Sequence, residues 1–158
     1  MSEPRRCPSC KQSDLVEGIG REELQVGGHL FEAELAVRRC DSCGEVVIKL
    51  DDWGKFEREI AGWFARTGVL SGEVFRFMRK AAGLRAKELA ELLDVTPETI
   101  SRWEKEHRQP DRKAMMVLGD LVLDRLKGED TALNRLRALG KERQAEGSID
   151  LTDSLRAA

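Results

Sequence analysis

The sequence predicts an α+β protein in which a small N-terminal antiparallel β module is followed by an all-α C-terminal domain. Three observations support this prediction: two Cys-x-x-Cys pairs, an alternating apolar pattern between them, and a series of capped amphipathic segments after them. A chain of 158 residues has room for one ordinary domain or two small ones. We expect the β module at 1–50, a linking helix and hinge at 51–70, a helical domain at 71–128, and a C-terminal helix with a frayed tail at 129–158.

The four cysteines form two pairs, Cys7 with Cys10 and Cys40 with Cys43. Each pair has the spacing that lets a tight turn present two thiolates to one metal ion, and four thiolates complete a tetrahedral zinc shell. Gly44 follows the second pair, where such a turn often needs a positive φ angle. We therefore predict one structural Zn²⁺ per chain, bound by these four cysteines.

Other roles of paired cysteines fit the sequence less well. A disulfide framework is typical of secreted proteins, but no apolar signal segment follows Met1. A redox motif needs only one Cys-x-x-Cys pair in a strand–helix context, and this chain has two pairs without that context. Iron–sulfur ligation stays open as an alternative.

The 29 residues between the cysteine pairs contain the predicted strands. Apolar residues alternate with other residues over 31–38, which is the period of a half-buried strand. Residues 24–26 form a second strand across Gly27-Gly28, a turn signal, and 46–48 form a third. These segments predict a small antiparallel sheet whose open end is closed by the metal.

A helix is expected after the sheet, with Asp51 and Asp52 as candidate N-caps and Thr67-Gly68 at its end. Its apolar stripe consists of Trp53, Phe56, Ile60, Trp63 and Phe64. Aromatic stripes at helical spacing are usually buried, so we expect this one to be part of the core. A partner-binding face is the alternative.

Capping residues divide the C-terminal half into short helices. Ser, Thr and Asp cap the first free N–H groups of a helix, Gly ends one, and Pro fits its first position. The expected helices are 73–82 between Ser71 and Gly83, 86–93, 98–105 after Thr96 and Pro97, 111–126 after Pro110 with Asp111 as its cap, and 130–146. A short helix, a tight turn and a capped helix in succession are the physical form of a DNA-binding helix-turn-helix.

This segment resembles the lambda-repressor-like, or XRE, family in residue type and in spacing over about 73–126. The matching stretches are 79–84, 88–90, 95–96, 99–104 and Pro110. The resemblance implies an ion pair between Arg79 and Glu104 that joins the first and third helices and serves structure. Ala86 stands where the family commonly has Gln, and Glu106 where a helix-ending Gly is usual. A left-handed cap at Glu106 would be less favourable by about 1 kcal/mol.

The third helix carries the candidate base readers, because Ile100 and Trp103 face the core and leave the other side to solvent. Arg102 can bind guanine O6 and N7 with both guanidinium arms, and Glu98 can accept from cytosine N4. Each residue also has an alternative role without DNA. Arg102 would then be a solvated surface arginine, and Glu98 would be in the first turn because the helix dipole favours an acidic residue there. The expected DNA-contact set is Arg85, Lys87, Thr96, Glu98, Thr99, Ser101, Arg102 and Arg108. Arg85, Lys87 and Arg108 are candidate phosphate clamps.

Charge is unevenly distributed along the chain, whose formal net charge is −2. Residues 14–61 hold 12 acidic and 6 basic side chains, whereas residues 76–113 hold 10 basic and 7 acidic ones. A basic segment in an acidic protein hints at a polyanion site, although a mixed-charge helical surface is the usual cause. No apolar run approaches the length of a membrane span, so we expect a cytoplasmic, nucleoid-associated protein.

The order of the two modules resembles the MqsA-type antitoxins, which join a YgiT-type zinc finger to an XRE helix-turn-helix. The similarity runs from Cys7-Pro8-x-Cys10 through 39–43 to 101–105 and covers most of the chain to about residue 126. It implies a homodimer that binds a palindromic operator through its C-terminal domain and an mRNA-cleaving toxin through its zinc domain. We expect the dimer seam on the apolar side of the 111–126 helix.

Three functions remain open at this stage: an antitoxin-type repressor, a stand-alone transcriptional regulator, and a zinc- or redox-responsive regulator whose thiolates are the sensor. His29 and His107 are isolated in the sequence, and no Ser/His/Asp or paired-carboxylate arrangement stands out. We therefore do not expect an enzyme.

Overall fold

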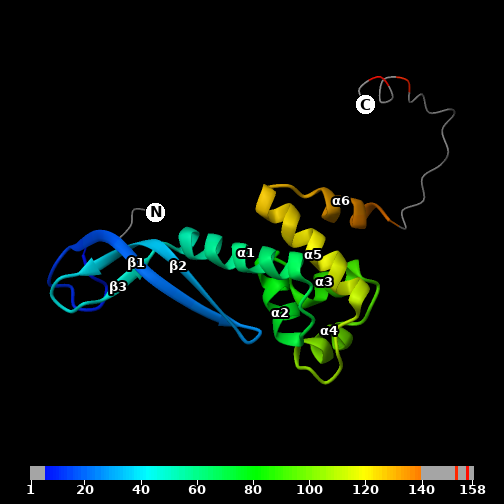
Figure 1. Cartoon of the computed structure of the whole chain (residues 1–158), viewed down its shortest axis with the longest axis horizontal. Coiled ribbons are helices and arrows are strands. Elements are labelled where there is room, and N and C mark those ends of the chain that lie inside the picture. The colour runs from blue at the N-terminus through cyan, green and yellow to red at the C-terminus, as the bar shows by residue number, and fades with distance from the viewer. Residues whose placement is uncertain (1–5, 140–151, 153–155, 157–158) are drawn as a thin grey trace.

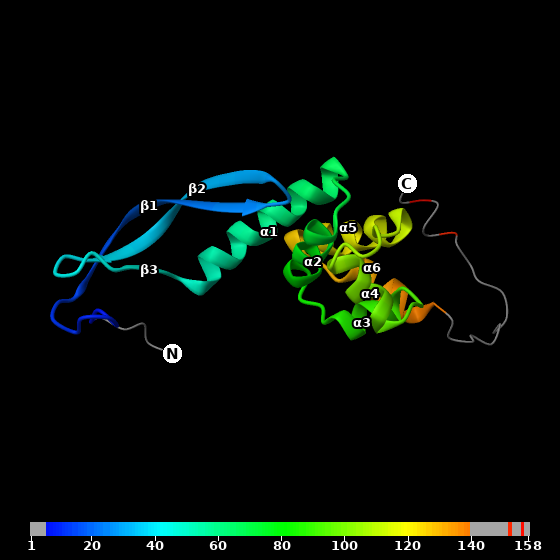
Figure 2. The same cartoon turned by 90° about the horizontal axis from the view of Figure 1, so that it is seen from below.

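The computed structural model describes residues 6–139, Thr152 and Arg156. In this part of the chain three strands are followed by six helices, which confirms the predicted α+β fold. The sheet occupies one end of an elongated molecule and the short helices occupy the other, with α1 (Leu50–Thr67) running between them (Figures 1 and 2).

The sheet is dominated by one long antiparallel hairpin, β1 (Leu15–Val26) with β2 (His29–Cys40). Gly27 and Gly28 form its turn with φ angles of 56° and 77°, which residues with a Cβ rarely adopt. A third strand, β3 (Val46–Ile48), pairs with β2 only at residues 37–39. The segments expected at 24–26 and 31–38 are thus parts of two strands of 12 residues each.

The helix α1 begins two to three residues earlier than its acidic residues suggest. Its N-cap is Lys49, which makes no side-chain capping bond, so the expected N-cap roles of Asp51 and Asp52 are wrong. Both carboxylates lie in the first turn, where they interact favourably with the helix dipole. The helix ends at a left-handed Gly68 with φ 71°, as the sequence predicts.

The predicted aromatic stripe of α1 packs toward β2, and Trp63 does so with 38% of its surface still exposed. At the hairpin tip the His29 and Trp63 ring centroids lie 5.2 Å apart, and those of Phe31 and Phe64 lie 5.4 Å apart. Val26 is only 4% exposed and belongs to the same buried cluster as the helical domain. The tip of the hairpin is therefore packed into the helical core.

The helical domain consists of α2 (Gly72–Ala81), α3 (Ala86–Leu92), α4 (Pro97–Glu104), α5 (Arg112–Lys127) and α6 (Thr131–Ala138). Three predicted N-caps form: Ser71 accepts from the Val74 N–H, Thr96 from that of Thr99, and Asp111 from those of Lys113 and Ala114. These bonds satisfy N–H groups that the helices leave free.

Two expectations for the C-terminal part are wrong. The helix expected at 130–146 ends at Ala138, because Leu139 is extended with ψ 142°, and residues 140–146 lie outside the described part of the chain. The apolar side of α5 is also not available as a dimer seam, since α1 and α2 cover it within the chain. Its buried side chains are Met115, Leu118, Leu121 and Val122.

Candidate functional site

The four cysteines meet at the end of the sheet that lies away from the helical domain. Their sulfur atoms all lie within 4.8 Å of one another. The Sγ atoms of Cys7 and Cys43 are 3.6 Å apart, and so are those of Cys10 and Cys40. A disulfide needs about 2.05 Å, whereas four sulfurs about 2.3 Å from one tetrahedral zinc ion lie about 3.8 Å apart. The cluster therefore fits a single tetrahedral metal ion.

The same backbone turn presents each cysteine pair. The Lys11 N–H donates to the Cys7 carbonyl at 3.1 Å, and the Gly44 N–H donates to the Cys40 carbonyl at 2.8 Å. Both donors are left-handed, with φ 58° at Lys11 and φ 75° at Gly44. The positive φ angle predicted for Gly44 thus also occurs at Lys11, although this conformation is less favourable for a residue with a side chain.

Ser13 is a member of this site that the sequence analysis missed. Its hydroxyl lies 3.1 Å from the Cys40 sulfur and lowers the pKa of that thiol to about 6. At Cys43 the Glu45 N–H lowers the pKa, but the Cys40 thiol, burial, and the thiols of Cys7 and Cys10 together outweigh it and raise the pKa to about 12. Thiolates this close repel one another, and a bound cation relieves that repulsion.

The second candidate site is the exposed side of α4. Ile100 and Trp103 are 0% and 4% exposed and anchor the helix in the core. Glu98 and Arg102 are exposed on the opposite side, with Thr99 and Ser101 half-buried beside them. The helix therefore presents to solvent the two side chains expected to read bases.

Arg79 and Glu104 hold α4 against α2. The Arg79 guanidinium donates from Nε to Glu104 Oε1 at 2.5 Å, from Nη2 to Oε2 at 3.1 Å, and from Nη1 to the Leu84 carbonyl at 2.7 Å. Both side chains are largely buried, at 10% and 12% exposure. Phe75 packs edge-on against Trp103 with ring centroids 5.5 Å apart. These contacts fix the orientation of α4 relative to α2.

The three candidate phosphate clamps differ in their surroundings. Arg85 caps α3 and donates to Glu88 at 3.0 Å, which helps to lower the pKa of Glu88 to about 2. Lys87 and Arg108 are exposed and form no ion pair with the residues that the structure describes. Thr96 uses its hydroxyl oxygen as the N-cap of α4. Of the three candidate clamps, Lys87 and Arg108 are thus more available to an incoming phosphate than Arg85.

Glu106 has a structural role that its sequence position did not suggest. It adopts the left-handed conformation with φ 59°, in the place where a Gly is usual. Its carboxylate accepts from the Gly72 N–H at 3.3 Å, at the start of α2. A Cβ at Gly72 would lie 2.2 Å from the Trp103 carbonyl, so this approach requires glycine. The second departure, Ala86, is the half-buried first residue of α3.

Comparison with known proteins identifies one segment. Residues 75–118, from α2 into α5, match the family model described as helix-turn-helix. No curated protein matches the chain. None of the described helices has the length and apolar character needed to cross a membrane. The match and the exposed side of α4 together support a DNA-binding regulator of the XRE type, a class whose members are usually not enzymes.

Proposed function

We propose that the protein is a sequence-specific transcriptional repressor that binds a palindromic operator as a homodimer. The observation that carries this proposal is the presentation of α4, with Arg102 and Glu98 exposed while the buried Arg79–Glu104 pair fixes the helix. In this arrangement Arg102 reads a guanine and Glu98 accepts from a cytosine in the major groove. Two copies of α4 then lie about 34 Å apart, in successive turns of the groove.

Phosphate contacts position the domain on the duplex. Lys87 and Arg108 are exposed on the elements that flank α4, and Thr96 and Thr99 lie at its N-terminus, where the helix dipole attracts an anion. Arg85 contributes after its guanidinium exchanges Glu88 for a phosphate. These residues hold the DNA without reading it, whereas Arg102 and Glu98 supply the specificity.

We further propose that the four cysteines bind one structural Zn²⁺ and that the zinc module binds a protein partner, an mRNA-cleaving toxin. The thiol-only donor set and its tetrahedral spacing favour zinc. Residues 14–61 carry 12 acidic and 6 basic side chains, which suits a basic partner and disfavours nucleic acid at this end. The protein is then the antitoxin of a type II pair and acts at the nucleoid in the cytoplasm.

The test is a binding titration on the promoter of the gene itself, at two salt concentrations. Arg102→Ala should lose about 1–3 kcal/mol of discrimination in each half-site, with no change in fold or metal content. Arg85→Ala should weaken binding to all sequences alike and reduce the salt dependence. Arg135→Ala, an exposed arginine on α6, is the matched control for loss of one charge and should bind as wild type does.

Promoter binding by Arg102→Ala that equals wild type, with no other DNA preferred, contradicts the repressor role. Sedimentation as a monomer, both free and on the promoter, contradicts the dimer. Specific promoter binding without a neighbouring toxin gene identifies a stand-alone regulator instead of an antitoxin.

A further inference from the structure

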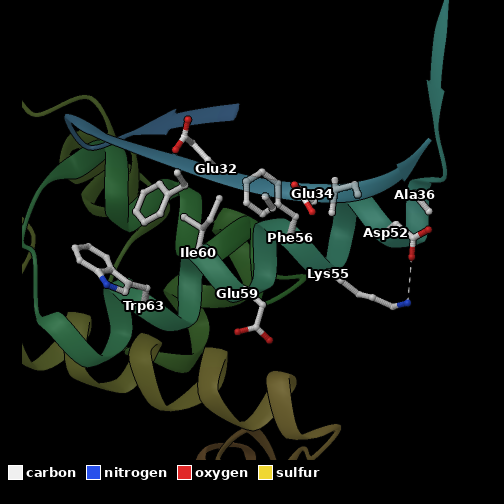
Figure 3. A pocket seen from close by; sticks show the side chains of 12 residues that line it. Glu32, Glu34, Ala36, Asp52, Lys55, Phe56, Glu59, Ile60 and Trp63 are labelled. Carbon is white, nitrogen blue, oxygen red and sulfur yellow. Dashed lines mark hydrogen bonds and ion pairs between the residues drawn. The ribbon is translucent and has the colours of Figure 1, made fainter. Parts of the chain in front are cut away.

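An apolar groove lies between β2 and α1, on the face of the sheet that α1 covers (Figure 3). Its volume is about 570 Å³. The strand contributes Phe31, Ala33 and Leu35 to its lining, and the helix contributes Phe56, Ile60 and Trp63. Trp63 keeps 38% of its surface exposed, although its ring packs edge-on against Phe31 and Phe64.

The strand that borders this groove has one unpaired edge. β1 pairs with one edge of β2 along its whole length. On the other edge β3 pairs only with residues 37–39, and no described strand pairs with residues 29–36. An edge of this kind presents alternate N–H and C=O groups that another strand can bind. The groove therefore has a hydrogen-bonding wall as well as an apolar lining.

Each wall of the groove also carries one carboxylate without an ion pair among the described residues. Glu34 stands on the strand, on the face opposite to Ala33 and Leu35, and Glu59 stands on the helix; both are exposed (Figure 3). The other acidic groups nearby are already paired. Asp52 is 3.2 Å from the Lys55 amine, and Glu32 accepts from Arg21 at 2.7 Å. The two unpaired carboxylates favour cationic side chains in whatever occupies the groove.

We propose that an extended segment of a partner protein, with alternating apolar and basic residues, binds here as a fourth strand. Its backbone pairs with residues 31–36 of β2, a length of about 20 Å. Its apolar side chains enter the groove beside Phe31, Ala33 and Leu35, and its basic side chains point to the opposite face of the sheet, where they lie beside Glu34. Glu59 adds negative potential on the helix side of the groove. This mode is β-strand addition, in which backbone bonds provide affinity and alternate side chains provide specificity.

Other occupants fit these observations less well. A second copy of the chain would bring two Glu34 carboxylates together across the new edge, and nucleic acid would be repelled by both walls. A small molecule could fill the apolar lining but would leave the strand edge unpaired. The proposal rests on the partner role proposed above and names the kind of segment that the partner supplies.

The experiment uses the full-length zinc-loaded protein and a fluorescent peptide of alternating valine and arginine, as long as the unpaired edge. We expect saturable binding by fluorescence anisotropy. Two further peptides carry N-methyl groups, either on every valine or on every arginine. Because only alternate amides of an added strand face β2, one methylated peptide should bind about tenfold more weakly or worse, while the other keeps its affinity.

The matched variants separate charge at the groove from charge elsewhere. Glu34→Lys with Glu59→Lys should weaken binding of the unmodified peptide about tenfold or more. Asp120→Lys with Glu129→Lys makes the same net change at exposed positions of α5 and the turn after it, and should bind the peptide as wild type does. Circular dichroism and zinc content confirm that both variants fold.

Three outcomes overturn the proposal: equal binding of the two methylated peptides, equal binding of a glutamate–valine peptide, and self-association that the groove variant abolishes. The last result would make a second copy the occupant. Promoter binding by the two double variants is measured in parallel and should be equal. Absence of peptide binding by the wild-type protein, with promoter binding intact, would refute the groove proposal alone, whereas failure of the Arg102→Ala test would refute only the repressor.

Discussion

The metal end of the sheet and the helical domain are stabilised by different interactions. The described residues around the cysteines bury little apolar surface besides Val37, and Val46 and Leu50 nearby are 36% and 84% exposed. In the helical domain, by contrast, large side chains are fully buried. Those at 0% exposure include Phe75, Met78, Leu89, Ile100 and Leu118. An apolar core holds one region, while the other depends on its thiolates.

The hairpin that joins the two regions belongs to both. At one end Cys40 closes the metal cluster, and at the other end Val26 is packed among the residues of the helical core. The two ends of this one hairpin are therefore stabilised by different interactions. This view predicts that damage to one end of the hairpin should not propagate fully to the other.

Among the predicted changes, removal of the metal should destabilise the protein most, and it should do so only at the metal end of the sheet. A structural zinc contributes folding energy directly, about 10–16 kcal/mol of apparent binding energy in zinc-finger peptides. Chelation, or Cys40→Ser, should therefore unfold residues 6–14 and 37–48 while the α2–α5 amides and the hairpin tip stay protected. Hydrogen exchange followed by segment measures this. Ser42→Ala, in the same turn, is the control and should retain both metal and protection.

Loss of protection in α2–α5 on chelation would contradict this division of the molecule. A preparation that contains iron and a visible chromophore in place of zinc would instead contradict the identity of the metal.

Arg79→Ala should produce the next largest effect, confined to the helical side. It leaves the Glu104 carboxylate largely buried without its cation and frees the Leu84 carbonyl, a loss of about 3 kcal/mol. Arg21→Ala removes an ion pair of similar length, 2.7 Å, on the exposed hairpin and should leave stability close to wild type. Thermal unfolding of both variants tests the comparison. Equal destabilisation would show that burial is not what gives the Arg79 pair its importance.

Local signals were sufficient to predict much of this architecture. Cysteine spacing predicted the cluster, and Ser71, Thr96 and Asp111 predicted helix starts because a cap satisfies N–H groups of its own helix. Gly27-Gly28 predicted the hairpin turn because few other residues adopt its backbone angles. Each of these features depends on residues that are neighbours in sequence.

The features that sequence did not predict depend on distant contacts. Residues 15–23 of β1 include two glycines and several charges, and they are extended because β2 pairs with them along its whole length. The hydrogen bond from the Gly72 N–H to Glu106 depends on packing between residues that are 34 positions apart in the sequence. Ser13 was missed because its partner, Cys40, lies 27 residues away. The contact between the hairpin tip and α2 also had no local signal.

That contact yields the smallest predicted effect, and two adjacent glycines can measure it. Gly27 and Gly28 both have positive φ, so an alanine at either position should destabilise the turn by about 1 kcal/mol. Only at Gly27 would the new Cβ meet the helical domain, 2.5 Å from Val74 Cγ2, whereas nothing lies within 4 Å at Gly28. Gly27→Ala should therefore cost about 1 kcal/mol more than Gly28→Ala.

The difference between the two alanine variants should disappear in a Val74→Ala background, which removes the opposing methyl groups. It should persist after chelation, because the tip is held by the helical core and not by the metal. Chemical denaturation of the four variants, with and without chelator, measures both effects as a double-mutant cycle. If the two variants were equally stable in the wild-type background, the tip would not be packed on α2, and the thiolate cluster and α1 would be the remaining anchors of the hairpin.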